Sequence, residues 1–178
     1  MNWKLRGFKR FIFIILILVC LTNLIYAQNN ELELVRLSQV VLYQPNSALE
    51  RRVNVVDLSN YIKDIMKCYN DYLLSKNYKN ESSAIILFAV NSNHNKKIWL
   101  IDNYNNLNNV ELNFLLMNIN SPLVNESSVA AAIFIGNYNE LNANINNGLY
   151  LPEEWLEIPR NNNRQFTIDD ILDIILEG

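Results

Sequence analysis

The sequence is short of the residue types on which most catalytic and metal sites depend. It has one histidine, His94, two cysteines, and four glycines scattered over 178 residues. One histidine and so few thiols cannot supply a structural zinc site, and scattered glycines form no phosphate-binding loop. We therefore expect no metal, no cofactor and no catalytic residue in this protein.

A catalytic dyad of a nucleophile and a general base would have to combine Cys68 with His94, the sole histidine. Cys68 falls on or beside the apolar stripe of a predicted helix, where a thiol usually serves as a small buried hydrophobe. His94 falls in a predicted hairpin turn, where an exposed turn residue is the simpler interpretation. The pair is thus a poor basis for assigning an enzyme.

The N-terminus has the order of a secretory signal sequence. An uninterrupted apolar run at 11–21 is followed by Ala27 and a polar stretch, and four basic residues precede it: Lys4, Arg6, Lys9 and Arg10. This order predicts a signal peptide over 1–27 and an exported domain over 28–178, periplasmic or secreted.

Two alternatives to cleavage stay open. The apolar stretch 11–27 reaches the lower limit of about 17 residues for a membrane span, so an uncleaved inner-membrane anchor is one. Lipidation of Cys20 is the other, although Val19 before it is bulkier than the small residue that lipoproteins carry there. Contact with the membrane is expected only if the leader is retained.

Basic residues are scarce beyond the leader. Without residues 1–27 the chain has 11 basic against 18 acidic residues, a formal net charge of −7. Its adjacent basic pairs, Arg51-Arg52 and Lys96-Lys97, are too small to attract a phosphate backbone, so we expect no nucleic-acid partner. Only Cys68 remains, which excludes an internal disulfide and leaves the apolar core to hold the domain.

The apolar pattern predicts an α+β fold, in which helices pack on one face of a small antiparallel sheet and a C-terminal helix follows. Three- and four-residue spacing predicts helices at 57–75, with Asp57 as its N-cap, at 109–119, and from 167, with a start at 167–170 that resembles a capping box. Apolar runs predict strands at 83–90, 98–101 and 129–135, and the nearly continuous run at 83–90 predicts a central strand. In the polar turn at 91–97 we expect asparagine to adopt the positive φ. Residues 31–43 fit either a strand or a helix. The polar stretch 160–166 predicts a linker to the terminal helix.

Acidic and aromatic residues gather in the C-terminal third. Glu153 and Glu154 precede Trp155, and three aspartates crowd the last helix: Asp169, Asp170 and Asp173. Paired carboxylates beside an aromatic ring are what a glycosidase needs. A first helical turn also favours negative charge without any catalytic role. We interpret four residues as candidate interaction residues: Trp99, Trp155, Glu153 and Glu154. Tryptophans are also common in protein cores, which is the alternative for Trp99 and Trp155.

The stretch 58–135 has an order of elements that resembles the C-terminal domain of TonB-type energy transducers. The matching pieces are a helix, the strand Ile85-Ile86-Leu87-Phe88-Ala89-Val90, a polar turn, the strand Ile98-Trp99-Leu100-Ile101, a second helix, Pro122, and Ala131-Ala132-Ile133-Phe134-Ile135. Ser82-Ser83 stand where that family carries glycines. The resemblance implies a small extracytoplasmic binding module that pairs an edge strand with a partner.

Three functions follow as hypotheses. The first is an exported, non-enzymatic interaction or accessory module of the bacterial cell envelope, whose partner is another envelope protein. The second is a periplasmic immunity or inhibitor protein, because an acidic surface can block the basic cleft of a toxin or enzyme. The third is an envelope glycan hydrolase that uses Glu153, Glu154 or Asp169.

Overall fold

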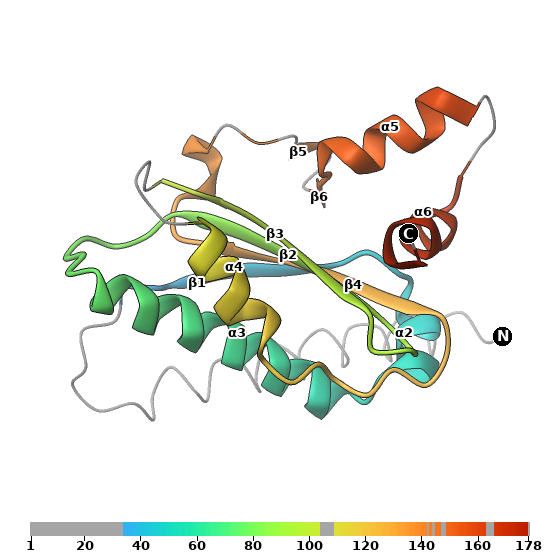
Figure 1. Cartoon of the computed structure of the whole chain (residues 1–178), viewed down its shortest axis with the longest axis horizontal. Coiled ribbons are helices and arrows are strands. Elements are labelled where there is room, and N and C mark those ends of the chain that lie inside the picture. The colour runs from blue at the N-terminus through green and yellow to red at the C-terminus, as the bar shows by residue number, and fades with distance from the viewer. Residues whose placement is uncertain are drawn as a thin grey trace, which may run out of the picture.

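The structure, a computed structural model, describes residues 34–103, 109–141, 143, 145–146, 149–162 and 166–177, and it is built on a four-stranded antiparallel sheet (Figure 1). The strands, in spatial order, are β1 (Leu37–Leu42), β4 (Ser128–Ile135), β2 (Ala84–Asn91) and β3 (Lys96–Asp102). The predicted α+β class is confirmed. The predicted leader, with its alternatives at 11–27 and Cys20, lies outside the described residues.

The helices are α2 (Asn46–Arg52), α3 (Val55–Ser75), α4 (Asn109–Met117), α5 (Glu153–Asn162) and α6 (Ile168–Glu177). Between β4 and α5 come a 3-10 turn, Tyr138–Glu140, and a small hairpin of β5 (Ile145–Asn146) and β6 (Leu149–Tyr150). Residues 37–42, which fitted two interpretations in the sequence, form a strand because they pair with β4.

Strands β2 and β4 form the buried centre of the sheet. Every residue of both strands is buried, and the two strands pair with each other from Ala84 and Ile135 to Asn91 and Ser128. An unbroken apolar run is the pattern of a strand covered on both faces, so the prediction of a central strand at 83–90 is confirmed.

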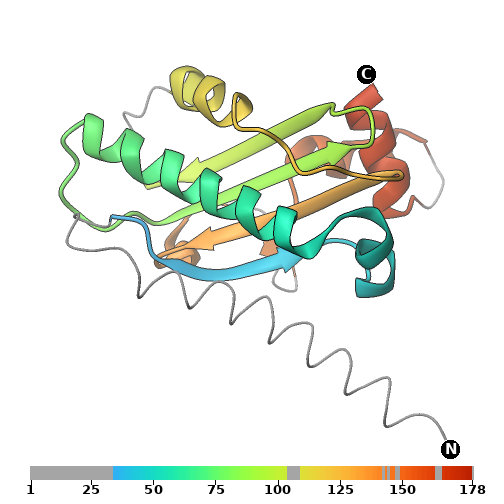
Figure 2. The same ribbon diagram turned by 90° about the horizontal axis from the view of Figure 1, so that it is seen from below.

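One face of the sheet is covered by α3 and α4 (Figure 2). Alternate residues of β2 point to this face, and they pack with α3 side chains at helical spacing: Ala84, Ile86, Phe88, Val90, Leu58, Tyr61, Ile62, Ile65, Tyr69 and Leu73. The ring of Tyr61 meets that of Phe88 edge-on, with centroids 4.9 Å apart. These contacts explain why the best-patterned helix of the sequence is also the longest.

The opposite face is covered by α5 and α6 (Figure 1). Its sheet residues include three alanines, Ala89, Ala130 and Ala132, whose small side chains leave room for Trp155 and for Leu172. The sequence predicted the C-terminal helix but not which face of the sheet it covers. The structure places it with α5, so the sheet is sandwiched between two layers.

Local polar contacts start two of the helices. Asn54, not Asp57, caps α3, because its side chain accepts a hydrogen bond of 2.8 Å from the Val56 N–H. At α6 the capping box predicted from the sequence is confirmed. The Asp170 N–H donates to Thr167 Oγ1 at 3.2 Å, and the Thr167 N–H donates to Asp170 Oδ2 at 2.8 Å.

Two further details differ from the sequence-based expectation. The positive φ of the β2–β3 turn, 63°, falls on His94, while the Asn91 side chain accepts from the N–H groups of Asn93 and Asn95. The linker predicted at 160–166 begins later, because α5 continues to Asn162; residues 163–165 lie outside the described residues. In the part of the chain that the structure describes, no helix is both long and apolar enough to cross a membrane.

Candidate protein-interaction edge

Strand β3 lies at one edge of the sheet, because β2 is its only strand neighbour among the residues that the structure describes. It pairs on one side with β2 over seven consecutive residue pairs without a break in register. Unlike the two fully buried central strands, β3 is partly exposed along its length, and only Ile98 in it is buried. Because an edge strand retains unpaired main-chain groups, it is a template on which another strand can add.

The hydrogen-bond pattern fixes which groups face outward. The Asn91 N–H donates to the Asn95 carbonyl and the Asn103 N–H to the Ser83 carbonyl, each at 3.0 Å, at the two ends of the β2–β3 ladder. Bonded pairs alternate with non-bonded pairs in an antiparallel ladder. It follows that four residues direct their N–H and C=O groups away from β2: Lys96, Ile98, Leu100 and Asp102. We call this row the β3 edge.

The opposite edge, β1, is a poorer template. Its register against β4 shifts between Leu37 and Gln39, and beyond that shift the Tyr43 N–H donates to the Ala130 carbonyl at 3.1 Å. The same alternation leaves only Val40 and Leu42 in the regular part of β1 with outward main-chain groups. A bulge and a short length are two common ways in which proteins blunt an edge.

Two predicted interaction residues, Trp99 and Glu154, meet beside the β3 edge. Trp99, on β3, donates its indole N–H to Glu154 at the start of α5. The same carboxylate accepts from Lys97 Nζ at 2.8 Å, and that ammonium lies 5.6 Å from the centre of the Trp99 ring. Glu154 therefore ties α5 to β3 through a charged and an aromatic contact, and these contacts hold the edge strand in place.

Trp155 and Glu153 have different positions. Trp155 is only 1% exposed, and its ring lies between those of Trp99 and Tyr43, at centroid distances of 5.5 and 5.4 Å. Since it fills the core under α5, Trp155 supports the β3 edge from within and has no exposed contact surface of its own. Glu153 is exposed at the first turn of α5 and does not share the contacts of Glu154.

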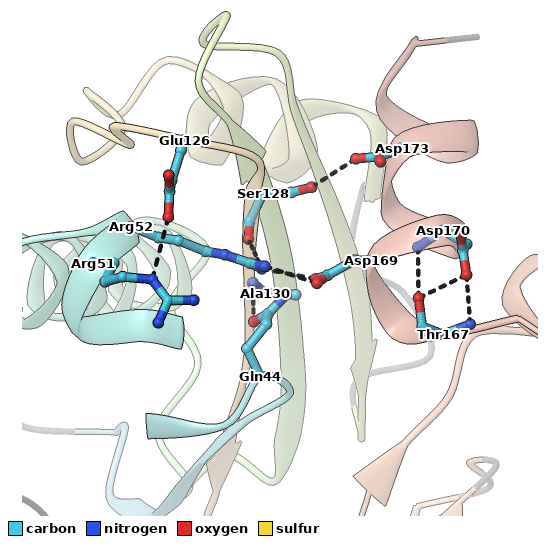
Figure 3. A network of polar contacts seen from close by, with 10 residues as sticks. All are labelled: Gln44, Arg51, Arg52, Glu126, Ser128, Ala130, Thr167, Asp169, Asp170 and Asp173. Atoms are coloured by element: carbon cyan, nitrogen blue, oxygen red, sulfur yellow. Dashed lines mark hydrogen bonds and ion pairs between the residues drawn. The ribbon is translucent and has the colours of Figure 1, made fainter. Parts of the chain in front are cut away.

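The carboxylates of α6 form a separate, structural network (Figure 3). Asp169 accepts two hydrogen bonds of 2.7 Å from the terminal nitrogens of Arg52, which also donates to the Ser128 carbonyl at 3.0 Å. The hydrogen bond from Arg52 holds the pKa of Asp169 below its usual range. A carboxylate that is held ionised in this way is unsuited to act as a general acid. The neighbouring Asp173 is also engaged in the network, because it accepts a hydrogen bond from Ser128 Oγ.

Cys68 and His94 both belong to the part of the chain that the structure describes, and no contact joins their side chains, which lie in different surroundings. Cys68 is half-buried on α3, beside Tyr72 and Leu115, whereas His94 is exposed in the β2–β3 turn. Burial, with a smaller contribution from Asp71, raises the pKa of the Cys68 thiol. A nucleophilic thiol needs the opposite shift. In the described residues no three His, Cys, Asp or Glu side chains gather as a metal-ligand group.

Comparison with known proteins gives no relative. No protein-family model, no curated protein and no solved structure matches this chain. The candidate site thus depends on the geometry of β3 and its neighbours. The sequence identified Trp99 and Glu154 but not the main-chain groups of the β3 edge. A signal for an edge strand was the mixed polar and apolar pattern of β3, Lys-Lys-Ile-Trp-Leu-Ile-Asp, which contrasts with the unbroken apolar runs of β2 and β4.

Proposed function

We propose that this protein is an exported, non-enzymatic binding module of the bacterial cell envelope. In this proposal it takes up an extended segment of another envelope protein as an additional strand beside β3. The observation that carries the proposal is the regular row of outward main-chain groups at Lys96, Ile98 and Leu100. Main-chain hydrogen bonds of this kind give affinity, and neighbouring side chains give specificity.

The surroundings of the edge support this mode of binding. Trp99 is half-exposed on the strand itself, and Lys97 and Glu154 flank it. An aromatic ring with a charged pair beside it can contact the alternate side chains of an added strand. The resemblance to the C-terminal domain of TonB-type transducers, drawn from the sequence, implies the same kind of strand pairing.

A substitution at Leu100 tests the proposal. Leu100→Pro removes an outward N–H and leaves the β2–β3 ladder intact, because proline is tolerated where the N–H faces solvent. Leu100→Ala is the matched control, since it removes the same packing but keeps the N–H. A photo-reactive amino acid in place of Asp102 would capture the bound segment in producing cells, with Ser38 on β1 as the control position.

Two outcomes separate the proposal from its alternatives. We expect cross-links from position 102 to one envelope protein, at about tenfold lower yield in Leu100→Pro than in Leu100→Ala, a difference that corresponds to about 1.4 kcal/mol. Cross-links that form from position 38 instead, or that are equal in the two variants, would show that β3 is not the binding edge.

The acidic C-terminal layer favours a second candidate, an immunity or inhibitor protein. The sequences of α5 and α6 contain seven acidic residues and one basic residue, and exposed members include Glu153, Glu157, Asp173 and Glu177. Such a surface complements the basic cleft of a toxin or enzyme. A deletion strain should then stop growing beside toxin-producing siblings, and normal growth would count against this candidate.

A further inference from the structure

Helices α3 and α4 lie on the face of the sheet opposite the acidic layer (Figure 2). Residues of both helices line a groove between them. Lys76 and Glu111 join the two helices with an ion pair of 2.9 Å. Beside this pair lies a hollow of about 440 Å³. Its α3 wall consists of residues at helical spacing, Asp64, Lys67, Cys68, Asp71, Tyr72 and Ser75, and Leu115 completes the α4 wall.

The α4 side of the groove carries an exposed apolar ridge. Leu112 and Leu116 are buried against the core, but α4 is apolar on its outer side as well. Val110 is 81% exposed, Phe114 67% and Leu115 39%. A surface helix normally has polar residues there. Leu115 lines the hollow, and Phe114 and Val110 extend the exposed apolar side of α4 beyond it. An exposed apolar patch of this kind is typical of a binding site.

The α3 side carries exposed negative charge. Asp64 and Asp71 are both exposed and lie two helical turns apart, a rise of about 10 Å along α3. Neither makes an ion pair with any residue that the structure describes, and Lys67 stands between them. The charge of Glu111 is offset by Lys76. The α3 wall of the groove therefore carries two carboxylates and one ammonium, a net charge of −1, and apolar Leu115 faces it from α4.

We propose that this groove docks an amphipathic helix of a partner protein that carries basic residues beside its apolar stripe. The apolar stripe would cover Phe114 and Leu115, and lysine or arginine residues two turns apart would face Asp64 and Asp71. Helices that bind in grooves present anchors at i, i+3, i+4 and i+7, which is the spacing that we expect for the apolar stripe of the partner. The groove is distinct from the β3 edge and does not depend on its function.

Two synthetic peptides probe the groove without knowledge of the partner. Both are 14-residue helices with leucine on one face. The remaining positions are all lysine in the first peptide and all glutamate in the second. We expect the Leu/Lys peptide to bind the purified protein with a Kd of roughly 10–100 μM, and the Leu/Glu peptide to bind at least about tenfold more weakly. NMR shifts of backbone amides on α3 and α4 would locate the bound peptide.

Surface variants decide whether the contact is specific. We expect the double substitution Phe114→Ser and Leu115→Ser to lower the affinity of the protein for the Leu/Lys peptide by about tenfold or more, because apolar burial is lost. Asp64→Asn with Asp71→Asn should reduce the preference for lysine over glutamate about fivefold, as is usual for exposed charge pairs. Val56→Ser is the control, since Val56 is also exposed, at 61%, but does not line the groove.

The opposite results would overturn the proposal. These are no binding of either peptide at 1 mM, amide shifts confined to α5 and α6, or equal affinities for the wild type and the Phe114→Ser, Leu115→Ser protein. All the substituted side chains are exposed, and a thermal unfolding curve for each variant would confirm that it is folded. A partner that binds the β3 edge would leave the α3–α4 shifts unaffected, so the two proposals fail separately.

Discussion

Arg52 and Asp169 form a two-pronged ion pair across 117 residues of sequence, with both nitrogen-to-oxygen distances at 2.7 Å. The Arg52 side chain is 10% exposed and that of Asp169 is 40% exposed. Arg52 belongs to α2 and Asp169 to the first turn of α6, so the pair joins the two ends of the described fold (Figure 3). Bidentate geometry makes this contact stronger than an ordinary surface pair.

Arg52→Met should therefore destabilise the protein. It removes the partner of Asp169 and the hydrogen bond to the Ser128 carbonyl, at a cost of about 2 kcal/mol, less than the ~3–5 kcal/mol for a fully buried pair. Arg51→Met is the matched control, because Arg51 pairs with Glu126 at 3.5 Å on the surface and should contribute less than about 0.5 kcal/mol. Urea unfolding would measure both, and equal effects would contradict the structural role of Arg52.

The same pair predicts how stability depends on pH. Arg52 lowers the pKa of Asp169 in the folded state, so its contribution is fully present above the unfolded pKa of about 3.9 and is lost as pH falls through the lower folded value. Asp169→Asn should be less stable than the wild type at pH 7, and the difference should narrow below about pH 4. A difference that stays constant from pH 7 to pH 2.5 would contradict the assignment.

Gly136 ends β4 with a φ of 57°. A Cβ atom at this position would collide with the Ser82 carbonyl oxygen. Gly136→Ala should thus lower the free energy of unfolding by about 1–3 kcal/mol through strain and displacement of the neighbouring backbone. Asn139→Ala, at an exposed position shortly after, should change it by less than about 0.5 kcal/mol. Thermal unfolding would compare the two.

The two described tryptophans should differ in their effect on stability. Trp155→Ala removes a fully buried ring and should cost about 3–5 kcal/mol. Trp99→Ala removes a half-exposed ring and should cost about 1–2 kcal/mol. If Trp99 contacts a partner at the β3 edge, its substitution should weaken binding far more than it weakens the fold. Chemical denaturation followed by circular dichroism would give both free energies.

Cys68 should react slowly with alkylating reagents in the folded protein. Its thiol has a raised pKa, so a smaller thiolate fraction is present at pH 8 than in an unfolded chain. We expect the rate with iodoacetamide to be lower than in urea and to keep rising at pH values where a free cysteine has reached its plateau. A folded-state rate equal to the unfolded rate at pH 8 would exclude this environment.

Much of the fold could be predicted because it follows from local apolar pattern. The unbroken runs that became β2 and β4 could be covered only on both faces, and the spacing of Tyr61, Ile65 and Tyr69 could be buried only as a helix. The capping box of Thr167 and Asp170 is likewise local. The cap of α3 was assigned three residues too late, because Asn54 and Asp57 are both good capping residues and only tertiary packing selects between them.

The candidate site was less accessible to prediction because it consists of relationships between distant segments. Which strand lies at an edge depends on the order of strands in the sheet. The outward groups of β3 are main-chain N–H and C=O groups, which nearly every residue type carries and which therefore leave no mark in the sequence. The sequence selected Trp99 and Trp155 alike, yet one lies on the edge and the other beneath α5. The partnership of Arg52 with Asp169 has no local signal at all.

The position of α6 also determines when the fold can be completed during synthesis. Its residues Leu172 and Leu176 cover a sheet face that is formed by β2 and β4, and the chain reaches them long after both strands have been made. A ribosome adds residues from the N-terminus, so this face is covered only in part, by α5, until 168–177 emerge. The core on this face can therefore be closed only after nearly all of the described chain has been made.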